Sequence, residues 1–265
     1  AACTPSGVER DQTAAAIARK AHLEPLVAKG YRFDLQLYRR AGTGPLFVYI
    51  EGDGFAFLDT RTPSSDPTPA EPLALELAAV DPAAGVLYIG RPCQFAPGRA
   101  DRRCAVEDWT DARFSRAAIL AIDEAIDSVL SHSSHRSLVL IGYSGGGVVA
   151  ALIAARRRDV ALLITVAAPL DLDAWLRRMH LSPLSGSLSP LDGRANLVHT
   201  PQVHFAGAHD AIVPPDVTRS GAERLMAPAS GRMIVIPEFD HRCCWVRDWP
   251  VLRDEALRVT TGAAR

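Results

Sequence analysis

The chain has 265 residues, 48% of them hydrophobic, which is enough to build one large core. Its 29 basic and 30 acidic residues give a formal net charge of −1, so charge offers no basis for binding nucleic acid. No stretch approaches the run of about 18 apolar residues that a membrane-spanning helix needs. We therefore expect one domain without a membrane-spanning helix.

Hydrophobic periodicity predicts that helices and strands alternate along this domain. We expect residues 1–12 to form a flexible segment and residues 13–265 to form the domain. The predicted elements, in chain order, are a helix over 13–29, strands over 31–40 and 46–50, a helix over 72–79, a strand over 85–89, a helix over 109–130, and strands over 138–143, 161–166, 203–206 and 233–236. Short apolar strands separated by helices are typical of an α/β fold, with a mostly parallel sheet covered on both faces.

Ser144 lies where the predicted strand 138–143 runs directly into a helix, in the pattern Gly142-x-Ser144-x-Gly146. So tight a turn forces strained dihedral angles on the serine and leaves no room for a Cβ atom at either glycine. The pattern is short and occurs by chance in other chains. Its setting between an apolar strand and an apolar helix indicates that Ser144 is a nucleophile.

A serine nucleophile needs a histidine to take its proton and a carboxylate to orient that histidine. His241 follows the predicted strand 233–236, and Asp210 follows the strand 203–206, so both lie where a parallel sheet would bring them to one edge. Asp171 and Asp173 follow another strand and remain alternatives for the acid. We expect Asp240 to be too close to its neighbour His241 in sequence to orient it.

The negative charge that develops on the attacked carbonyl oxygen needs two backbone N–H donors. Gly145, directly after the serine, is expected to supply one. The second is expected from the turn Glu51-Gly-Asp-Gly-Phe55, most plausibly from Asp53, with Gly52 as the neighbouring candidate. An ordinary glycine turn is the alternative interpretation of this segment.

These residues together resemble the α/β-hydrolase family over about residues 31–260. The order Ser144, Asp210, His241 is similar to the family order, and Phe205-x-Gly-x-x-Asp210-x-x-Val-Pro214 resembles its acid-strand signature. The family's usual His-Gly oxyanion segment is replaced here by Glu-Gly-Asp-Gly. The resemblance implies acyl transfer to water through an acyl-enzyme on Ser144, with a small-molecule ester as substrate.

The resemblance leaves the substrate open, because amides, peptides and thioesters are cleaved by the same machinery. A catalytically inactive hydrolase-fold protein that acts as a binding module is a further alternative. Serine at position 144 argues against a dehalogenase, which would need a carboxylate there. Residues 170–200 lie where family members insert a lid. This segment is too short for a large lid, which favours small or medium acyl groups in the substrate. No metal, nucleotide cofactor or protein partner is implied.

The cysteines point to an oxidising compartment. Cys93 and Cys104 flank a polar loop, and we expect them to form a disulfide bond. Adjacent Cys243 and Cys244 would close a strained ring, so buried free thiols are an equal alternative. The N-terminal Ala-Ala-Cys3 resembles the end of a lipoprotein signal, which predicts lipidation of Cys3 and an exported protein, periplasmic or anchored to a bacterial membrane.

Overall fold

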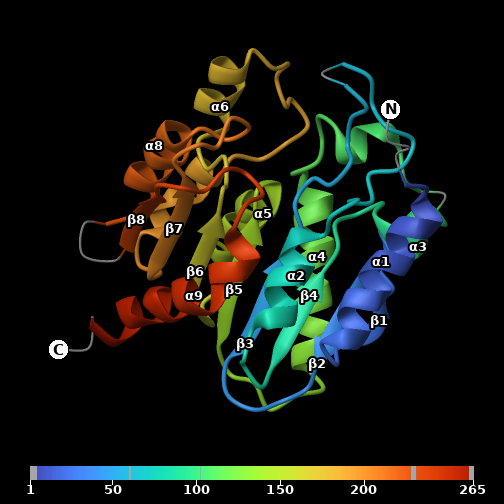
Figure 1. Ribbon diagram of the computed structural model, residues 1–265, viewed down its shortest axis with the longest axis horizontal. Coiled ribbons are helices and arrows are strands. Elements are labelled where there is room, and N and C mark those ends of the chain that lie inside the picture. Colours follow the sequence, from blue (N-terminus) through green and yellow to red (C-terminus); the bar gives the residue numbers. More distant parts are fainter. Residues whose placement is uncertain (1–4, 60, 102, 228–230, 263–265) are drawn as a thin grey trace.

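The computed structural model describes residues 5–59, 61–101, 103–227 and 231–262. These residues form an eight-stranded sheet in the order β1-β2-β4-β3-β5-β6-β7-β8 (Figure 1). The strands are β1 (Glu24–Ala28), β2 (Leu35–Arg40), β3 (Leu46–Ile50), β4 (Val86–Ile89), β5 (Leu138–Tyr143), β6 (Val160–Val166), β7 (Gln202–Gly207) and β8 (Gly231–Ile236). β1 and β2 are antiparallel to their neighbours, and the remaining strands are parallel. The predicted mostly parallel α/β sheet is confirmed.

Helices cover both faces of the sheet (Figure 1). One face carries α1 (Gly7–Lys20), α2 (Leu73–Val80) and α9 (Trp245–Gly262), and the other carries α4 (Arg116–Leu130), α5 (Gly145–Ala154) and α8 (Pro215–Leu225). The connections contain α3 (Phe95–Arg99), α6 (Leu172–Met179), α7 (Arg194–Leu197) and the 3₁₀ helices η1 (Val106–Trp109) and η2 (Pro190–Gly193). Among the helices described, none combines the length and the apolar character needed to cross a bilayer.

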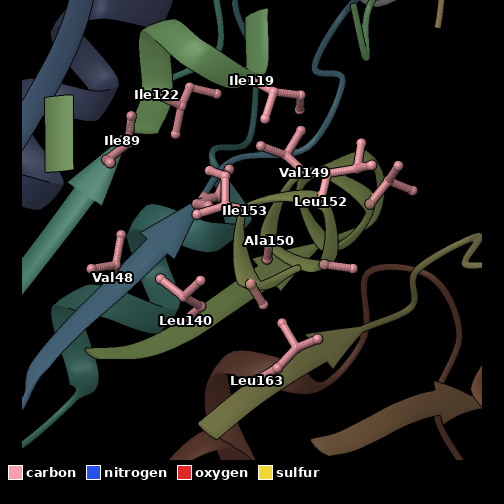
Figure 2. Packing of buried hydrophobic residues seen from close by; sticks show 14 of the residues in the cluster. Val48, Ile89, Ile119, Ile122, Leu140, Val149, Ala150, Leu152, Ile153 and Leu163 are labelled. Atoms are coloured by element: carbon pink, nitrogen blue, oxygen red, sulfur yellow. The ribbon is translucent and has the colours of Figure 1, made fainter. Parts of the chain in front are cut away.

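Two apolar clusters join the helices to the sheet, one on each face. Successive side chains of a strand point to opposite faces, so Val48 of β3 packs toward α4 and α5 while Tyr49 packs toward α2 and α9. Figure 2 shows the first cluster, which includes Val48, Ile89, Leu140 and Leu163 from the strands and Ile119, Ile122, Val149, Leu152 and Ile153 from the helices. Each such side chain stabilises the fold by roughly 1.5–3 kcal/mol when fully buried.

The N-terminal helix differs from its predicted range. Ser6 caps α1 by accepting a hydrogen bond from Glu9, so residues 7–12, expected to be flexible, are helical. Helix α1 ends at Lys20, because the chain turns at His22 with a φ of 56°. Pro25 then lies in the edge strand β1, where its missing N–H is tolerated.

The long helix before Ser144 is shorter than predicted. Helix α4 begins at Arg116 rather than at 109, because the hydroxyl of Ser115 caps it by accepting from the amide of Ala118. Trp109 belongs to the separate 3₁₀ helix η1. The turn between η1 and α4 contains Arg113, whose side chain reaches toward the ends of the central strands.

Candidate active site

Ser144 is the turn residue between the central strand β5 and helix α5, with φ 52° and ψ −125°. A positive φ is rare for a residue other than glycine and marks a strained backbone. The flanking glycines are required by space: a Cβ atom on Gly142 would lie 2.2 Å from the carbonyl oxygen of Gly146, and one on Gly146 would lie 2.2 Å from that of Ile50. The predicted strand–turn–helix geometry around Ser144 is therefore present.

His241 and Asp210 lie beside Ser144. His241 Nε2 is 3.1 Å from Ser144 Oγ, and His241 Nδ1 is 2.8 Å from Asp210 Oδ2. The three residues follow β5, β7 and β8, which are parallel, so their carboxyl ends meet at one edge of the sheet. A proton on Nδ1, donated to Asp210, leaves Nε2 to accept the Ser144 hydroxyl proton.

The Asp210 side chain is fixed by its own loop. Its Oδ1 accepts hydrogen bonds from the amides of Ile212 and Val213, at 2.9 Å and 2.7 Å. The carboxylate is fully buried, whereas the His241 side chain is 12% exposed. Oδ2 is thereby directed at His241, as an acid that orients the imidazole requires.

The alternative acids have other partners. Asp171 caps α6 by accepting from the amide of Ala174, and its other oxygen binds Ser220 and Arg224. Asp173 is exposed within α6. Asp240 accepts from the amides of the two residues that follow His241, so it stays with its own loop. Asp210 is the acid that meets His241.

The loop after β3 supplies a backbone donor, though not at both predicted positions. The amide of Gly52 donates to Glu51 Oε1 at 2.9 Å, so the expectation that Gly52 contributes a free N–H is wrong. Within the described part of the chain, the amides of Asp53 and Gly145 have no hydrogen-bond acceptor. Gly145 is the first residue of α5, where backbone N–H groups are unpaired and favour a negative charge. These two amides remain the candidates for binding an oxyanion.

Solved structures with the same arrangement of elements include the α/β hydrolase GrgF from Penicillium sp. sh18, at 13% identity and a TM-score of 0.63. The match covers 90% of this chain and 97% of that one. Est1E from Butyrivibrio proteoclasticus matches at 12% identity and a TM-score of 0.60, over 90% of this chain and 99% of that one. The esterase Pf2001 from Pyrococcus furiosus matches at 14% identity and 0.59, over 92% and 93%. The chain has the α/β-hydrolase fold.

No protein-family model matches the sequence, and no curated protein does. At 12–14% identity the likeness lies in the fold, so the site must be argued from its own geometry. Within this α/β-hydrolase fold the residue order and strand positions predicted for Ser144, Asp210 and His241 are those that the structure places in one hydrogen-bonded row.

Two aromatic side chains that sequence reasoning left out of the site hold the loop that carries His241. The Tyr143 hydroxyl donates to the His241 carbonyl oxygen at 3.1 Å, and its ring lies 5.3 Å from the imidazole. Trp245 Nε1 donates to the same carbonyl oxygen at 3.2 Å. Tyr143 is the variable residue before the nucleophile in the Gly-x-Ser-x-Gly pattern, so its position in the motif was the available signal.

Two arginines pair with the Asp53 carboxylate, and neither was predicted. Arg91 Nη1 donates to Oδ1 at 3.2 Å, and Arg113 Nη1 donates to Oδ2 at 2.7 Å. Burial disfavours the charged carboxylate, but the two guanidinium groups outweigh it and lower the pKa of Asp53. The position of Arg91 directly after strand β4 was a usable signal, whereas nothing local marks Arg113.

A second carboxyl group, that of Glu51, lies under the same loop and is 1% exposed. It accepts hydrogen bonds from the amide of Gly52 and from the hydroxyl of Tyr88, the latter at 3.1 Å. Burial raises the pKa of Glu51 to about 7, although these hydrogen bonds favour the ionised form. The Glu-Gly-Asp-Gly segment, which replaces the family's His-Gly, thus places a buried acid beneath the loop that carries the Asp53 amide.

The predicted disulfide bond between Cys93 and Cys104 is present, with sulfurs 2.04 Å apart. It closes the loop that carries Gln94, whose Nε2 donates to the Gly52 carbonyl oxygen at 3.0 Å. Cys243 and Cys244 are also joined, and Cys243 is exposed rather than buried. Cys3 lies outside the described residues. Among those described, Cys93, Cys104 and Asp108 are gathered closely enough to suit a metal, but both sulfurs belong to the disulfide.

Proposed function

We propose that the protein is a serine hydrolase that cleaves carboxylic esters through an acyl-enzyme on Ser144. The observation that carries the proposal is the row of hydrogen bonds from Ser144 Oγ through His241 to the buried Asp210 carboxylate, at 3.1 Å and 2.8 Å. The unpaired amides of Asp53 and Gly145 support it, since acyl transfer needs donors for the oxyanion. Pf2001, one of the solved structures with this fold, is named an esterase.

In the proposed reaction, Ser144 Oγ attacks the ester carbonyl carbon while His241 Nε2 takes the hydroxyl proton. The carbonyl oxygen becomes negatively charged and accepts hydrogen bonds from the amides of Gly145 and Asp53. The C–O bond to the alcohol breaks, and His241 returns the proton to the leaving alkoxide. Water then attacks the acyl-enzyme by the same steps, releasing the acid and restoring Ser144.

The experiment is to treat the purified protein with a fluorophosphonate and map the adduct, with nitrophenyl acetate turnover measured in parallel. We expect one adduct, on Ser144, and loss of both adduct and turnover in Ser144→Ala. A folded wild-type protein that gives neither adduct nor turnover contradicts the proposal and favours the binding-module alternative. If an anilide or a thioester is turned over faster than the matched ester, the ester assignment is wrong and the substrate is an amide or a thioester, cleaved by the same mechanism.

The proposed substrate has a small or medium acyl group, because residues 170–200 are too short to form a large apolar lid. Helix α6 in this segment is held by Trp175, whose Nε1 donates to the Ile212 carbonyl oxygen at 2.8 Å. Only isolated apolar side chains of the segment are exposed, such as Leu181 and Leu188 at 37% and 38%. We expect nitrophenyl butyrate to be cleaved faster than nitrophenyl palmitate, and the reverse order would contradict this substrate size.

We also propose that the protein is exported and anchored by a lipid on Cys3, in the periplasm or on a bacterial membrane. The Ala-Ala-Cys sequence and a disulfide between Cys93 and Cys104, which is typical of oxidising compartments, support this location. Mass spectrometry of the native protein extracted from membranes is the test. We expect a diacylated Cys3 at the N-terminus, and an unmodified peptide that extends upstream of Cys3 would contradict the proposal.

A further inference from the structure

The negatively charged Asp53 carboxylate lies beside the two amides that are proposed to stabilise a negative charge. A Cβ atom added to Gly145 would lie 2.0 Å from Asp53 Oδ1, so the carboxylate is packed against the first residue of α5. Gly145 carries one of the two amides assigned to the oxyanion, and Asp53 itself carries the other. An uncompensated carboxylate here would repel the developing charge and slow the reaction.

The compensation comes from two arginines on different segments. Arg91 follows strand β4 and Arg113 precedes helix α4, and their side chains are 5% and 10% exposed. Each binds a different oxygen of Asp53, so the carboxylate cannot rotate. Two cations against one carboxylate give these three side chains a net charge of +1, and Glu51, which also interacts with Arg91, adds a negative charge only as pH rises through its pKa of about 7. The other acid that lines the same cavity, Asp108, is paired with Arg32.

The arginines have no room to hold a substrate group themselves. The cavity that they line together with Asp53 and Trp109 measures about 10 Å³, which is the space of one water molecule at most. Other donors of the two guanidinium groups bind backbone carbonyls: Arg91 Nη2 binds that of Arg113, and Arg113 Nε binds that of Thr110. Any effect of the arginines on the reaction must therefore come from holding Asp53 and from their charge, and not from contact with the substrate.

We propose that Arg91 and Arg113 are positioning residues for the oxyanion-binding loop, an inference that rests on the function proposed above. They hold the Asp53 carboxylate from both sides, which fixes the backbone that carries the Asp53 amide. They also reverse the sign of the local charge, so that the oxyanion forms beside a cluster of +1 rather than beside a bare carboxylate. Because the oxyanion exists only in the transition state and the intermediate, the effect falls on kcat and leaves KM unchanged.

The test is a charge cycle made of wild type, Arg113→Gln and the double variant Arg113→Gln/Asp53→Asn. The cluster carries +1 in the wild type, zero in R113Q, and +1 again in the double variant. We expect kcat for nitrophenyl acetate to fall on the order of 10–100-fold in R113Q, with KM unchanged. We expect the double variant to recover kcat at least about threefold over R113Q, because its charge is restored.

Arginines that only held the fold together would make kcat follow the unfolding temperature through the series, because a buried ion pair that loses one partner is destabilised and losing both relieves part of that cost. We expect kcat, measured well below the unfolding temperature of every variant, to follow the charge of the cluster instead, and a kcat that follows the unfolding temperature overturns the inference. A double variant no faster than R113Q, or an R113Q with wild-type kcat, overturns the inference. Arg157→Gln is the matched control, because Arg157 is 11% exposed and bound to three aspartates after the far end of α5. It should lower the unfolding temperature and leave kcat unchanged.

Two further comparisons keep the result interpretable. If R113Q does not fold, Arg91→Gln and Arg91→Gln/Asp53→Asn make the same comparison from the other side of the carboxylate. The rate of Ser144 phosphonylation is measured in every variant. A wild type that takes no phosphonate and turns over no ester overturns the proposed function and this inference with it. A reactive wild type beside an unimpaired R113Q overturns the inference alone.

Discussion

At the scale of single residues, the proposed role of Asp210 can be tested by a substitution that keeps the size of its side chain. Asp210→Asn keeps the size of the side chain but favours the imidazole tautomer that cannot accept the Ser144 proton. We expect kcat to fall about 10⁴-fold with a small change in KM. Ester turnover and the unfolding temperature are to be measured together, because a loss of activity has meaning only in a folded variant.

The control for that substitution is Asp171→Asn, at the position that sequence reasoning kept as the alternative acid. Asparagine can still cap α6 but cannot form the ion pair with Arg224, so we expect a loss of at most about 1 kcal/mol in the free energy of unfolding and a kcat close to wild type. If D171N lost activity as D210N does, the assignment of the acid would be wrong.

Glu51 gives the stability of the protein a pH dependence. Its pKa is about 7 in the folded protein and about 4.5 in the unfolded chain. Between these values the folded state holds a proton that the unfolded state has lost, so stability falls as pH rises. The slope from this group is at most about 1.4 kcal/mol per pH unit, and it fades toward zero over roughly one pH unit below 4.5 and above 7.

Glu51→Gln tests this directly, because the neutral amide can still accept from the Gly52 amide and donate to the Tyr88 oxygen. We expect urea unfolding to show wild type losing up to about 3 kcal/mol relative to the variant between pH 5 and pH 8. Equal pH dependence in the two proteins would show that Glu51 titrates normally.

At the scale of elements, the Cys93–Cys104 disulfide supports the loop after β3 from the side of β4. It closes a chain segment with a sequence separation of 11, and Gln94 within that segment holds Gly52. We expect Cys93→Ser/Cys104→Ser to lose about 2–4 kcal/mol of stability. Because the loop that carries the Asp53 amide is loosened as well, and this amide is proposed to bind the oxyanion, kcat should fall more than KM rises. Chemical denaturation and steady-state kinetics measure the two effects separately.

Element boundaries show where local sequence was and was not informative. The apolar runs of β3 and β5 could be recognised as buried strands because no polar residue interrupts them. The strand β1 was included in the preceding helix, since its five residues lie at the sheet edge and carry no alternating pattern. Capping residues decided the starts of α1 and α4, and Ser6 and Ser115 are ordinary serines until their hydrogen bonds are seen.

At the scale of the whole molecule, the positions of Ser144, Asp210 and His241 were predictable because each follows a strand of a parallel sheet. Strand ends are visible in the sequence, and parallel strands gather them at one edge. The Asp53 cluster was not predictable, because Arg91 and Arg113 lie 38 and 60 residues from their partner and no spacing rule connects them. The hydrogen bond from the Gly52 amide to Glu51 was not predictable for a related reason. In the sequence Glu51 is an ordinary acid in a glycine turn, and only the fold buries it beside that amide.

The order of the strands has a consequence for the order in which the row of hydrogen bonds can form during folding. After β5, the strands β6, β7 and β8 are added outward one after another, and His241 comes only after β8, at the edge of the sheet. A chain in which the central strand and its turn have formed, but β8 has not yet paired, therefore leaves Ser144 without an imidazole beside it. In the proposed mechanism, proton transfer from that hydroxyl to His241 therefore requires β6, β7 and β8 all to be in place, so the reactive serine is among the last features that the folding chain completes.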